Sequence, residues 1–458
     1  MGRLLDAINR FVWGIPALIL ILAVGILLSV KTRWVQFRLF PTALRQFLSS
    51  LKKSEDGAGV SSYKALCTAL AATVGTGNLA GVAGAIAIGG PGAVFWMWIC
   101  ALLGMVTKFA EATLAVHFRV KSGDEAYMGG PMYIVRQGMP KRWQPLAGIY
   151  CFFGVVAAFG VGSATQVNAV LGGINGAVTA LGGRESGFVN LLIGIALAVL
   201  IVLVLYGGAK RIGTVASFLV PFASVFYLLL CFGVFLIKAS SIPGAFSAIV
   251  KGAFYPRAVT GGVIGSVFVA LRVGASRGVF TNEAGMGTAS IAHAGAIISH
   301  PVEQGMMGIV EVFLDTILIC TLTALAILCS GVPIKYGIDP GITLTMNAFV
   351  AVYGDWCVYL ITALVCILAF ATILGWGLYG VRCAQYLFGD HVWNIYVCMQ
   401  AVIVLVGIFL TTSVVWNLAE IVNGLMAIPN LIALVILSPE FIQILKDYLF
   451  KRKAYSSN

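Results

Sequence analysis

The chain has 458 residues, of which 60% are hydrophobic and only 10% are charged, and its mean hydropathy is +0.98. This composition excludes a soluble globular protein and indicates an integral membrane protein. The formal net charge of +12 would suit nucleic acid, but cytoplasmic loops of membrane proteins are also enriched in Lys and Arg, so the charge must first be compared with the topology.

Eleven apolar runs predict eleven membrane spans. Residues 65–107 contain no charge, and as one helix they would be about twice as long as a hydrocarbon core is thick. The helix-breaking sequence GGPG at residues 89–92 therefore separates two spans. The first run has no obvious A-x-A cleavage site, so we interpret it as a retained span and not as a signal peptide. The predicted spans are residues 11–30, 65–88, 92–117, 146–172, 188–207, 212–237, 259–297 (interrupted), 305–331, 356–380, 392–410 and 414–438.

The positive charge follows the topology. With the amino terminus outside, most Lys and Arg residues beyond the spans fall in predicted cytoplasmic segments, and the carboxy terminus is then cytoplasmic. We therefore expect a lipid bilayer and no nucleic acid as the partner. The ten cysteines lie almost all in apolar runs without a C-x-x-C spacing, which favours small buried side chains over a metal or redox centre.

The spans divide into two sets of five. Residues 1–64 hold an additional span and a basic amphipathic segment that we expect on the cytoplasmic face. The two sets cover residues 65–238 and 259–438, joined by an external connector at 239–258 and followed by a cytoplasmic tail at 439–458. Because five is odd, the second set crosses the membrane in the opposite sense. The sequence therefore predicts an all-α fold with a five-plus-five inverted repeat.

Each half opens with a span that glycines interrupt. The first contains LAATVGTGNLAGVAG at residues 70–84, and the second contains ALRVGASRGVFTNEAGMGTASIAHA at residues 270–294. The first comes close to a dinucleotide-binding fingerprint, but Gly77 and Gly81 are four residues apart and no strand precedes them. Interrupted helices at corresponding places in two inverted halves instead indicate a secondary transporter with its site near mid-bilayer.

The interruption at Gly75 offers ligands for both signs of charge. Amides freed at the start of the following half-helix suit an anion such as a carboxylate, whereas carbonyls around residues 71–74 suit a cation. Thr76 and Asn78 add polar side chains at this point. They either contact a ligand or merely cap the half-helix.

Two later spans supply further candidates. Gln166 lies on a polar helical face and contacts either substrate or a neighbouring helix. Thr372 can complete an oxygen shell for Na⁺, and the indole of Trp376, one turn away, would leave room only for a small substrate. The alternative is a hydroxyl bonded to its own helix beside a packing tryptophan.

Charged side chains at membrane depth are costly, and we expect most of them to pair with one another. Lys108 and Glu111 are three residues apart and can form an ion pair on their own helix. No ionisable residue lies in the first interrupted span, which favours Na⁺ over a proton as the coupling ion. The other charged residues within spans include Arg272, Arg277, Glu283, Glu311, Asp315 and Glu420.

Other functional classes fit less well. The sequence GASRG at residues 274–278 matches G-x-S-x-G, and His293 lies downstream, so we also consider an intramembrane serine hydrolase. That motif requires a strand that enters a helix, whereas here it interrupts an apolar span. A channel would normally show a repeated pore-lining filter, and an ATP-driven pump would need G-x-x-x-x-G-K-[ST], which is absent from the sequence.

Several long motifs resemble one family closely. They are GTGNLAGVAGAIAIGGPGAVFWMWICALLGMVTKFAEATLAV, GGPMYIV, RGVFTNEAGMGTASIAHA, HPVEQGMMGIVEVFLDTILICTLTALAIL and NGLMAIPNLIAL. Together they resemble the alanine/glycine:cation symporter family, the sodium:alanine symporters of bacteria and archaea, from about residue 60 to 438. The resemblance implies a fold similar to that of the bacterial leucine transporter.

The resemblance also implies roles for individual residues. The amides of Thr76 and Gly77 would receive the substrate carboxylate, with Asn78 beside it. The implied pocket walls are Gln166, Trp376 and unwound backbone near Gly274 and Ser276.

For the cation, the resemblance implies a place between the carbonyls of Ala71 and Val74 and the hydroxyl of Thr372. Relatives commonly have two adjacent hydroxyl residues where this chain has Ala371 and Thr372. The sodium site therefore either loses one ligand or uses another.

The sequence thus predicts Na⁺-coupled symport of alanine or glycine by alternating access, with no bond made or broken in the substrate. The alternatives are another neutral amino acid, such as glutamine, or coupling to H⁺. We expect a monomer in the cytoplasmic (inner) membrane of a bacterium or archaeon, with its amino terminus outside.

Overall fold

A computed structural model describes residues 12, 15–51, 60–122, 126–180, 182–410 and 412–456. Helices form most of it. The first half of the chain contains α2 (Ile15–Lys31), α3 (Val35–Ser50), β1 (Val60–Ser61), α4 (Ser62–Thr73), the π-helical η1 (Gly77–Gly81), α5 (Val82–Gly89), α6 (Gly92–His117), β2 (Val120–Ser122), β3 (Ala126–Met128), α7 (Pro131–Gly138), η2 (Lys141–Trp143), α8 (Pro145–Phe159), the π-helical η3 (Gly160–Ala164), α9 (Thr165–Ala180), α10 (Gly187–Leu205) and α11 (Gly208–Ile237).

The second half continues in the same manner. It contains η4 (Ala239–Ser241), α12 (Ile242–Phe254), α13 (Pro256–Val259), α14 (Val267–Asn282), α15 (Thr288–Ala294), β4 (Ala296–Ile297), α16 (Pro301–Val312), the π-helical η5 (Phe313–Cys320), α17 (Thr321–Ser330), α18 (Thr343–Tyr353), α19 (Cys357–Phe388), α20 (Val392–Gly407), α21 (Thr412–Ile436) and α22 (Ser438–Ser456).

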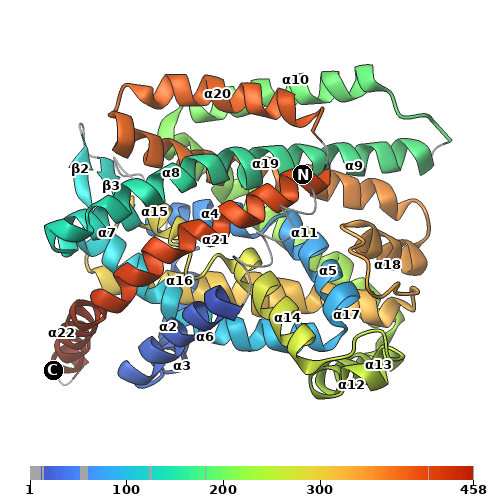
Figure 1. The fold of residues 1–458 in the computed structure, drawn as a ribbon, viewed down its shortest axis with the longest axis horizontal. Helices are drawn as coiled ribbons and strands as arrows, with labels where there is room; N and C mark the ends of the chain where they lie inside the picture. Colours follow the sequence, from blue (N-terminus) through green and yellow to red (C-terminus); the bar gives the residue numbers. More distant parts are fainter. Residues whose placement is uncertain are drawn as a thin grey trace.

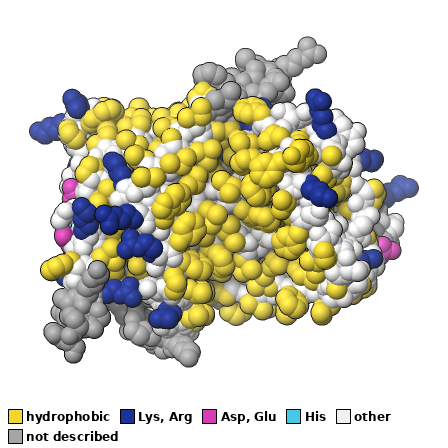
Figure 2. Space-filling view, turned by 90° about the horizontal axis from the view of Figure 1, so that it is seen from below, with side chains coloured by type: hydrophobic (Ala, Val, Ile, Leu, Met, Phe, Trp, Pro, Cys, Tyr) yellow, Lys and Arg dark blue, Asp and Glu magenta, His cyan; other side chains and the backbone are white. Residues whose placement is uncertain are grey.

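The long helices run along the horizontal axis of Figure 1. Helices α3, α7 and α22 lie toward the left of the view, and α12, α13 and α18 lie toward the right (Figure 1). Figure 2 shows a broad apolar face between ends that carry Lys and Arg side chains. This distribution is expected where a hydrocarbon layer surrounds the middle of the bundle.

Six helices in the described part of the chain are long and apolar enough to cross a membrane, or up to nine if each of three bent pairs counts as one span. The two other spans expected from the sequence correspond to α20, a shorter apolar helix, and to the broken pair α14 and α15. Helix α3 is bent by 82° from α2, as expected for an amphipathic segment that lies along the membrane surface. The connector predicted at residues 239–258 contains the helix α12.

Burial separates central helices from peripheral ones. In the most apolar part of α6 and of α19, 67% of the residues are buried, against 22% in α10 and 28% in α11. Central helices with buried glycines and alanines allow close backbone approach, whereas α10 and α11 present exposed Leu, Val and Phe side chains. The two interrupted spans lie among the central helices and contact α6 and α19.

Candidate functional site

The first interrupted span is broken where the glycines predict it. Helix α4 ends at Thr73, Val74 has an extended backbone (φ −78°, ψ 91°), and the chain bends by 49° before η1 and α5. The Gly75 amide donates a hydrogen bond to Asn78 Oδ1 at 2.9 Å. The side chain of Asn78 therefore replaces a helical acceptor and stabilises the break.

The Thr372 hydroxyl of α19 faces this break. A Cβ atom placed on Gly75 would lie 2.5 Å from Thr372 Oγ1, so only glycine allows the close approach. Thr372 Oγ1 is buried and has no hydrogen-bond partner among the described residues. One turn later α19 also packs on α4, where a Cβ on Gly375 would lie 2.8 Å from the amide nitrogen of Ala72. Thr372 is therefore held at the end of α4, where Ala71 in the last turn and Val74 just after the helix are buried.

Gln166 of α9 reaches the break from the other side. Thr76 Oγ1 donates to Gln166 Oε1 at 3.0 Å, and Gln166 Nε2 donates to the carbonyl of Val161 at 3.1 Å. Val161 belongs to η3, whose π-helical turn directs carbonyls away from the regular pattern. The structure thus brings together Thr76 and Gln166, which are 90 positions apart in the sequence.

Trp376 lies against the same π-helical segment. It is 1% exposed, and a Cβ on Gly162 would lie 2.3 Å from Trp376 Cβ, so the tryptophan packs directly on a glycine of η3. Its ring and that of Tyr379 are 5.8 Å apart between centroids. A Cβ placed on Gly77, at the start of η1, would lie 3.7 Å from the ring of Phe280 and 3.9 Å from Thr281 Cγ2.

A buried carboxylate that the sequence analysis did not assign also reaches the first break. Asn78 Nδ2 donates to Asp315 Oδ1 at 2.6 Å, and Thr316 Oγ1 donates to Asp315 Oδ2 at 2.7 Å. Asp315 is fully buried and comes from η5, not from either interrupted span. Although no ionisable residue lies in the first interrupted span itself, the break therefore contacts an ionisable side chain from another helix. No sequence spacing reveals this contact, because 237 positions separate the two residues.

The second interruption lies later than the sequence analysis placed it. Helix α14 is continuous from Val267 to Asn282, so the expectation of unwound backbone near Gly274 and Ser276 is wrong. A Cβ on Gly274 would lie 2.2 Å from the carbonyl oxygen of Ala93, which shows that this glycine serves the packing of α14 on α6. The break occupies residues 283–287, where Glu283, Gly285 and Gly287 have positive φ angles.

The amides of the second break are already satisfied by protein groups. Glu111 Oε1 of α6 accepts from the amides of Gly285 at 2.9 Å and Gly287 at 3.2 Å, and from Asn430 Nδ2 at 2.7 Å. A carboxylate thus occupies the positive end of the half-helix α15. The two breaks are not equivalent, because a carboxyl group of the protein bonds directly to the free amides of this one.

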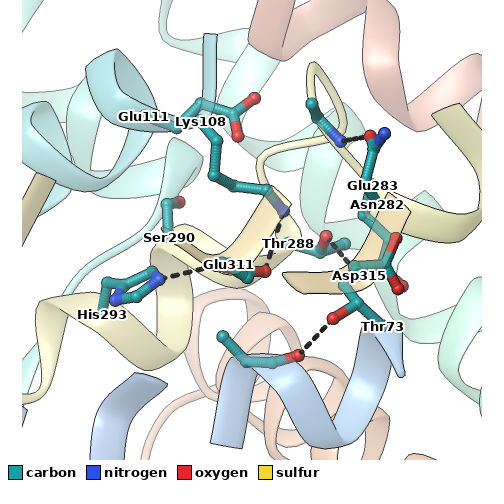
Figure 3. Close-up of polar contacts among 12 residues, drawn as sticks. Thr73, Lys108, Glu111, Asn282, Glu283, Thr288, Ser290, His293, Glu311 and Asp315 are labelled. Atoms are coloured by element: carbon teal, nitrogen blue, oxygen red, sulfur yellow. Dashed lines mark hydrogen bonds and ion pairs between the residues drawn. The ribbon is translucent and has the colours of Figure 1, made fainter. Parts of the chain in front are cut away.

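Lys108 does not pair with Glu111 as expected. Its Nζ atom lies 3.2 Å from Glu311 Oε1, and both side chains are fully buried. Glu311 Oε2 also lies 2.8 Å from His293 Nε2, and Figure 3 shows these three side chains converging. Because His293 is engaged here and Ser276 lies within a regular helix, the serine hydrolase interpretation is wrong.

A cavity of about 590 Å³ opens beside the first break. Arg277 spans it and donates to Glu420 Oε1 at 2.9 Å and to Asp339 Oδ2 at 3.1 Å. Thr76 is the predicted site residue that lines this cavity. The other lining residues are Ala80, Gly81, Thr165, Asn168, Ala169, Gly172, Pro340, Gly341, Ile342 and Thr343.

The model of the sodium:alanine symporter family matches residues 1–458. The chain belongs to this family. Among curated relatives, this symporter is 38% identical to the sodium/alanine symporter AgcS of Methanococcus maripaludis, over 99% of both chains. It is 36% identical to the amino-acid carrier protein AlsT of Bacillus subtilis, over 99% of this chain and 93% of that one.

A solved structure supports the fold of the symporter independently. The crystal structure of MhsT in complex with L-phenylalanine is similar with a TM-score of 0.59 at 15% identity, over 85% of this chain and 99% of that one. At this identity the similarity concerns the fold alone. It confirms the leucine-transporter-like fold expected from the sequence.

Proposed function

We propose that this symporter moves alanine or glycine together with Na⁺ by alternating access around the first break. The observation that carries the proposal is the buried Thr372 hydroxyl, which has no partner among the described residues and lies against the backbone of Gly75. An unpaired buried hydroxyl costs about 1–3 kcal/mol. A cation at this point would use the oxygen and remove that cost.

The Na⁺ site then consists of the Ala71 and Val74 carbonyls and the Thr372 hydroxyl. Helix α4 ends here with its carbonyls unpaired in the helical pattern, and this end of a helix carries partial negative charge. Ala371 supplies no side-chain oxygen. Na⁺ is a transported ion in this proposal and not a resident cofactor.

The substrate carboxylate binds the amides of Thr76 and Gly77, at the positive end of the half-helix that follows the break. The second break does not compete for it, because Glu111 already occupies the corresponding position. Asn78 positions the break through its bonds to Gly75 and Asp315 and lies beside the carboxylate. Sodium and substrate are thus held on opposite sides of one interrupted helix.

Gln166 and Trp376 set the walls of the pocket. Gln166 orients Thr76 through a hydrogen bond, and Trp376 fills the space above Gly162, which favours a small side chain on the substrate. Arg277, with Glu420 and Asp339, closes the side that we infer to be external. The proposed location is the cytoplasmic membrane, with the amino terminus outside and the chain acting as a monomer.

A second candidate for the coupling ion is H⁺, and Asp315 is the observation that favours it. This carboxyl group is buried and contacts the break through Asn78. It can bind the coupling proton in place of Na⁺. Proton relays in membranes commonly use such intramembrane carboxylates.

Uptake of radiolabelled alanine into proteoliposomes distinguishes these candidates. We expect accumulation with an imposed Na⁺ gradient at equal pH, and none with a pH gradient in K⁺ medium. Excess unlabelled glycine should compete, and glutamine should compete weakly. Uptake driven only by the pH gradient would reject Na⁺ coupling, and no uptake of any amino acid would reject the proposed function.

A further inference from the structure

The two interrupted spans are joined at the end that we infer to be cytoplasmic. Strand β1, directly before α4, pairs in parallel with β4, directly after α15, with Val60 opposite Ala296 and Ser61 opposite Ile297. The Arg119 guanidinium, just beyond α6, donates to the carbonyls of Ala294 and Ala296. The inner halves of both spans are therefore tied together by backbone hydrogen bonds.

A buried chain of side chains lies beside this pairing. Ser62 Oγ of α4 donates to Gln304 Oε1 at 2.6 Å, and Gln304 Nε2 contacts His293 Nδ1 at 2.7 Å. His293 Nε2 lies 2.8 Å from Glu311 Oε2, whose other oxygen lies 3.2 Å from Lys108 Nζ. This series of hydrogen-bonded side chains thus connects α4 to α16, α15 and α6.

The direction of each hydrogen bond in this chain follows from its first member. Because Gln304 accepts from Ser62 with its oxygen, its amide nitrogen donates to His293 Nδ1. Nδ1 then carries no proton, and the hydrogen on Nε2 faces the Glu311 carboxylate. One neutral tautomer satisfies every contact, so α15 is firmly attached to α16.

The members of the chain differ in what their separation would cost. Lys108, His293, Gln304 and Glu311 are all fully buried, and parting the charged pair would strand ions in a low-dielectric interior. Ser62 is half-buried and contributes one neutral hydrogen bond, which is far cheaper to break. The weakest contact in this series is therefore the hydrogen bond from Ser62 of α4 to Gln304 of α16.

We propose that the Ser62–Gln304 hydrogen bond and the β1–β4 pairing form an inner latch, which holds the inner half of the first interrupted span closed. This proposal rests on the proposed function. When the latch opens, α4 moves away while α15 stays with α16 and α6. Gln304 and His293 are positioning residues for this motion and do not contact the substrate.

Ser62→Ala removes the latch bond and leaves the His293–Glu311 contacts intact. Ser62→Thr should restore the hydroxyl, and Ser299→Ala is the matched control, because Ser299 Oγ donates to Glu303 on α16 and not to α4. Loss of one neutral hydrogen bond should raise the open population about fivefold. Hydrogen–deuterium exchange of residues 60–66 should accelerate by that factor, and exchange of residues 288–294 should not change.

Transport gives a second measurement in the same variants. In proteoliposomes, Ser62→Ala should raise the apparent KM for external alanine by less than about twofold, because a state that becomes fivefold more populated is a minor one and most carriers still face outward, while efflux is not slowed. Unchanged exchange in Ser62→Ala, an equal acceleration in Ser299→Ala, or no rescue by Ser62→Thr would overturn the latch. If the wild-type chain transports no amino acid, the proposed function fails, but the exchange experiment still decides the latch.

Discussion

Replacing Thr372 by valine tests the cation site with almost no change of shape. The substitution removes one hydroxyl that has no partner among the described residues and keeps a branched side chain against Gly75. If Thr372 serves only packing, the change should be neutral or stabilising, since a buried unpaired hydroxyl costs about 1–3 kcal/mol. If it is a ligand, the protein should lose affinity for Na⁺.

The expected loss follows from the strength of a contact between a polar group and an ion. Such a contact contributes about 1.5–3 kcal/mol, so the Na⁺ dissociation constant should rise roughly 10- to 150-fold. In K⁺ medium, Thr372→Val should melt at the same temperature as the wild type or slightly higher. In Na⁺ medium, the stabilisation seen for the wild type should be strongly reduced.

The assay is thermal unfolding of the purified protein over a range of Na⁺ concentrations, combined with the Na⁺ dependence of alanine uptake. Thr372→Ser, which keeps the hydroxyl, serves as the control and should retain most of the Na⁺ response. An unchanged Na⁺ dependence in Thr372→Val would refute the assignment of the site. A lower melting temperature in K⁺ medium would refute the argument about the unpaired hydroxyl.

Three further substitutions test other parts of the account. Gly75→Ala should lower the free energy of unfolding by about 1–3 kcal/mol and weaken Na⁺ binding, because the added Cβ would lie 2.5 Å from Thr372 Oγ1. Gly148→Ala is the control: its added Cβ meets nothing within 4 Å, so Na⁺ titrations should not change. Trp376→Phe should enlarge the pocket, and competition assays should then show stronger inhibition of alanine uptake by glutamine; unchanged competition would remove Trp376 from the pocket. Arg277→Gln should remove both ion pairs across the cavity and raise the apparent KM for external alanine severalfold, measured by initial uptake rates; a change confined to maximal rate would argue against an outer gate.

The membrane spans and the first break could be predicted because their signals are local. Helix α6 begins at Gly92 and ends at His117, as the apolar run and the GGPG sequence indicate. Helix α4 ends before Gly75 because Val74 is extended and Asn78 caps the freed amide of Gly75. Both features depend on neighbours within a few positions, which the sequence displays directly.

The second break and the ion pairs could not be predicted in the same way. Glycines at 274 and 278 suggest unwinding, yet they serve close packing of α14 on α6, whereas the real break is fixed by Glu111 from a distant helix. Lys108 has Glu111 one turn away but pairs with Glu311 of the neighbouring helix α16. Such choices depend on tertiary contacts that no spacing rule contains.

The mutual dependence of Na⁺ and alanine binding tests the central claim most directly. If one interrupted helix holds both ligands, calorimetry on the purified protein should show that Na⁺ tightens alanine binding, and that alanine tightens Na⁺ binding by the same factor. K⁺ should have no such effect, and Thr372→Val should reduce the coupling. Equal alanine affinity in Na⁺ and K⁺ media would contradict a shared site at the first break.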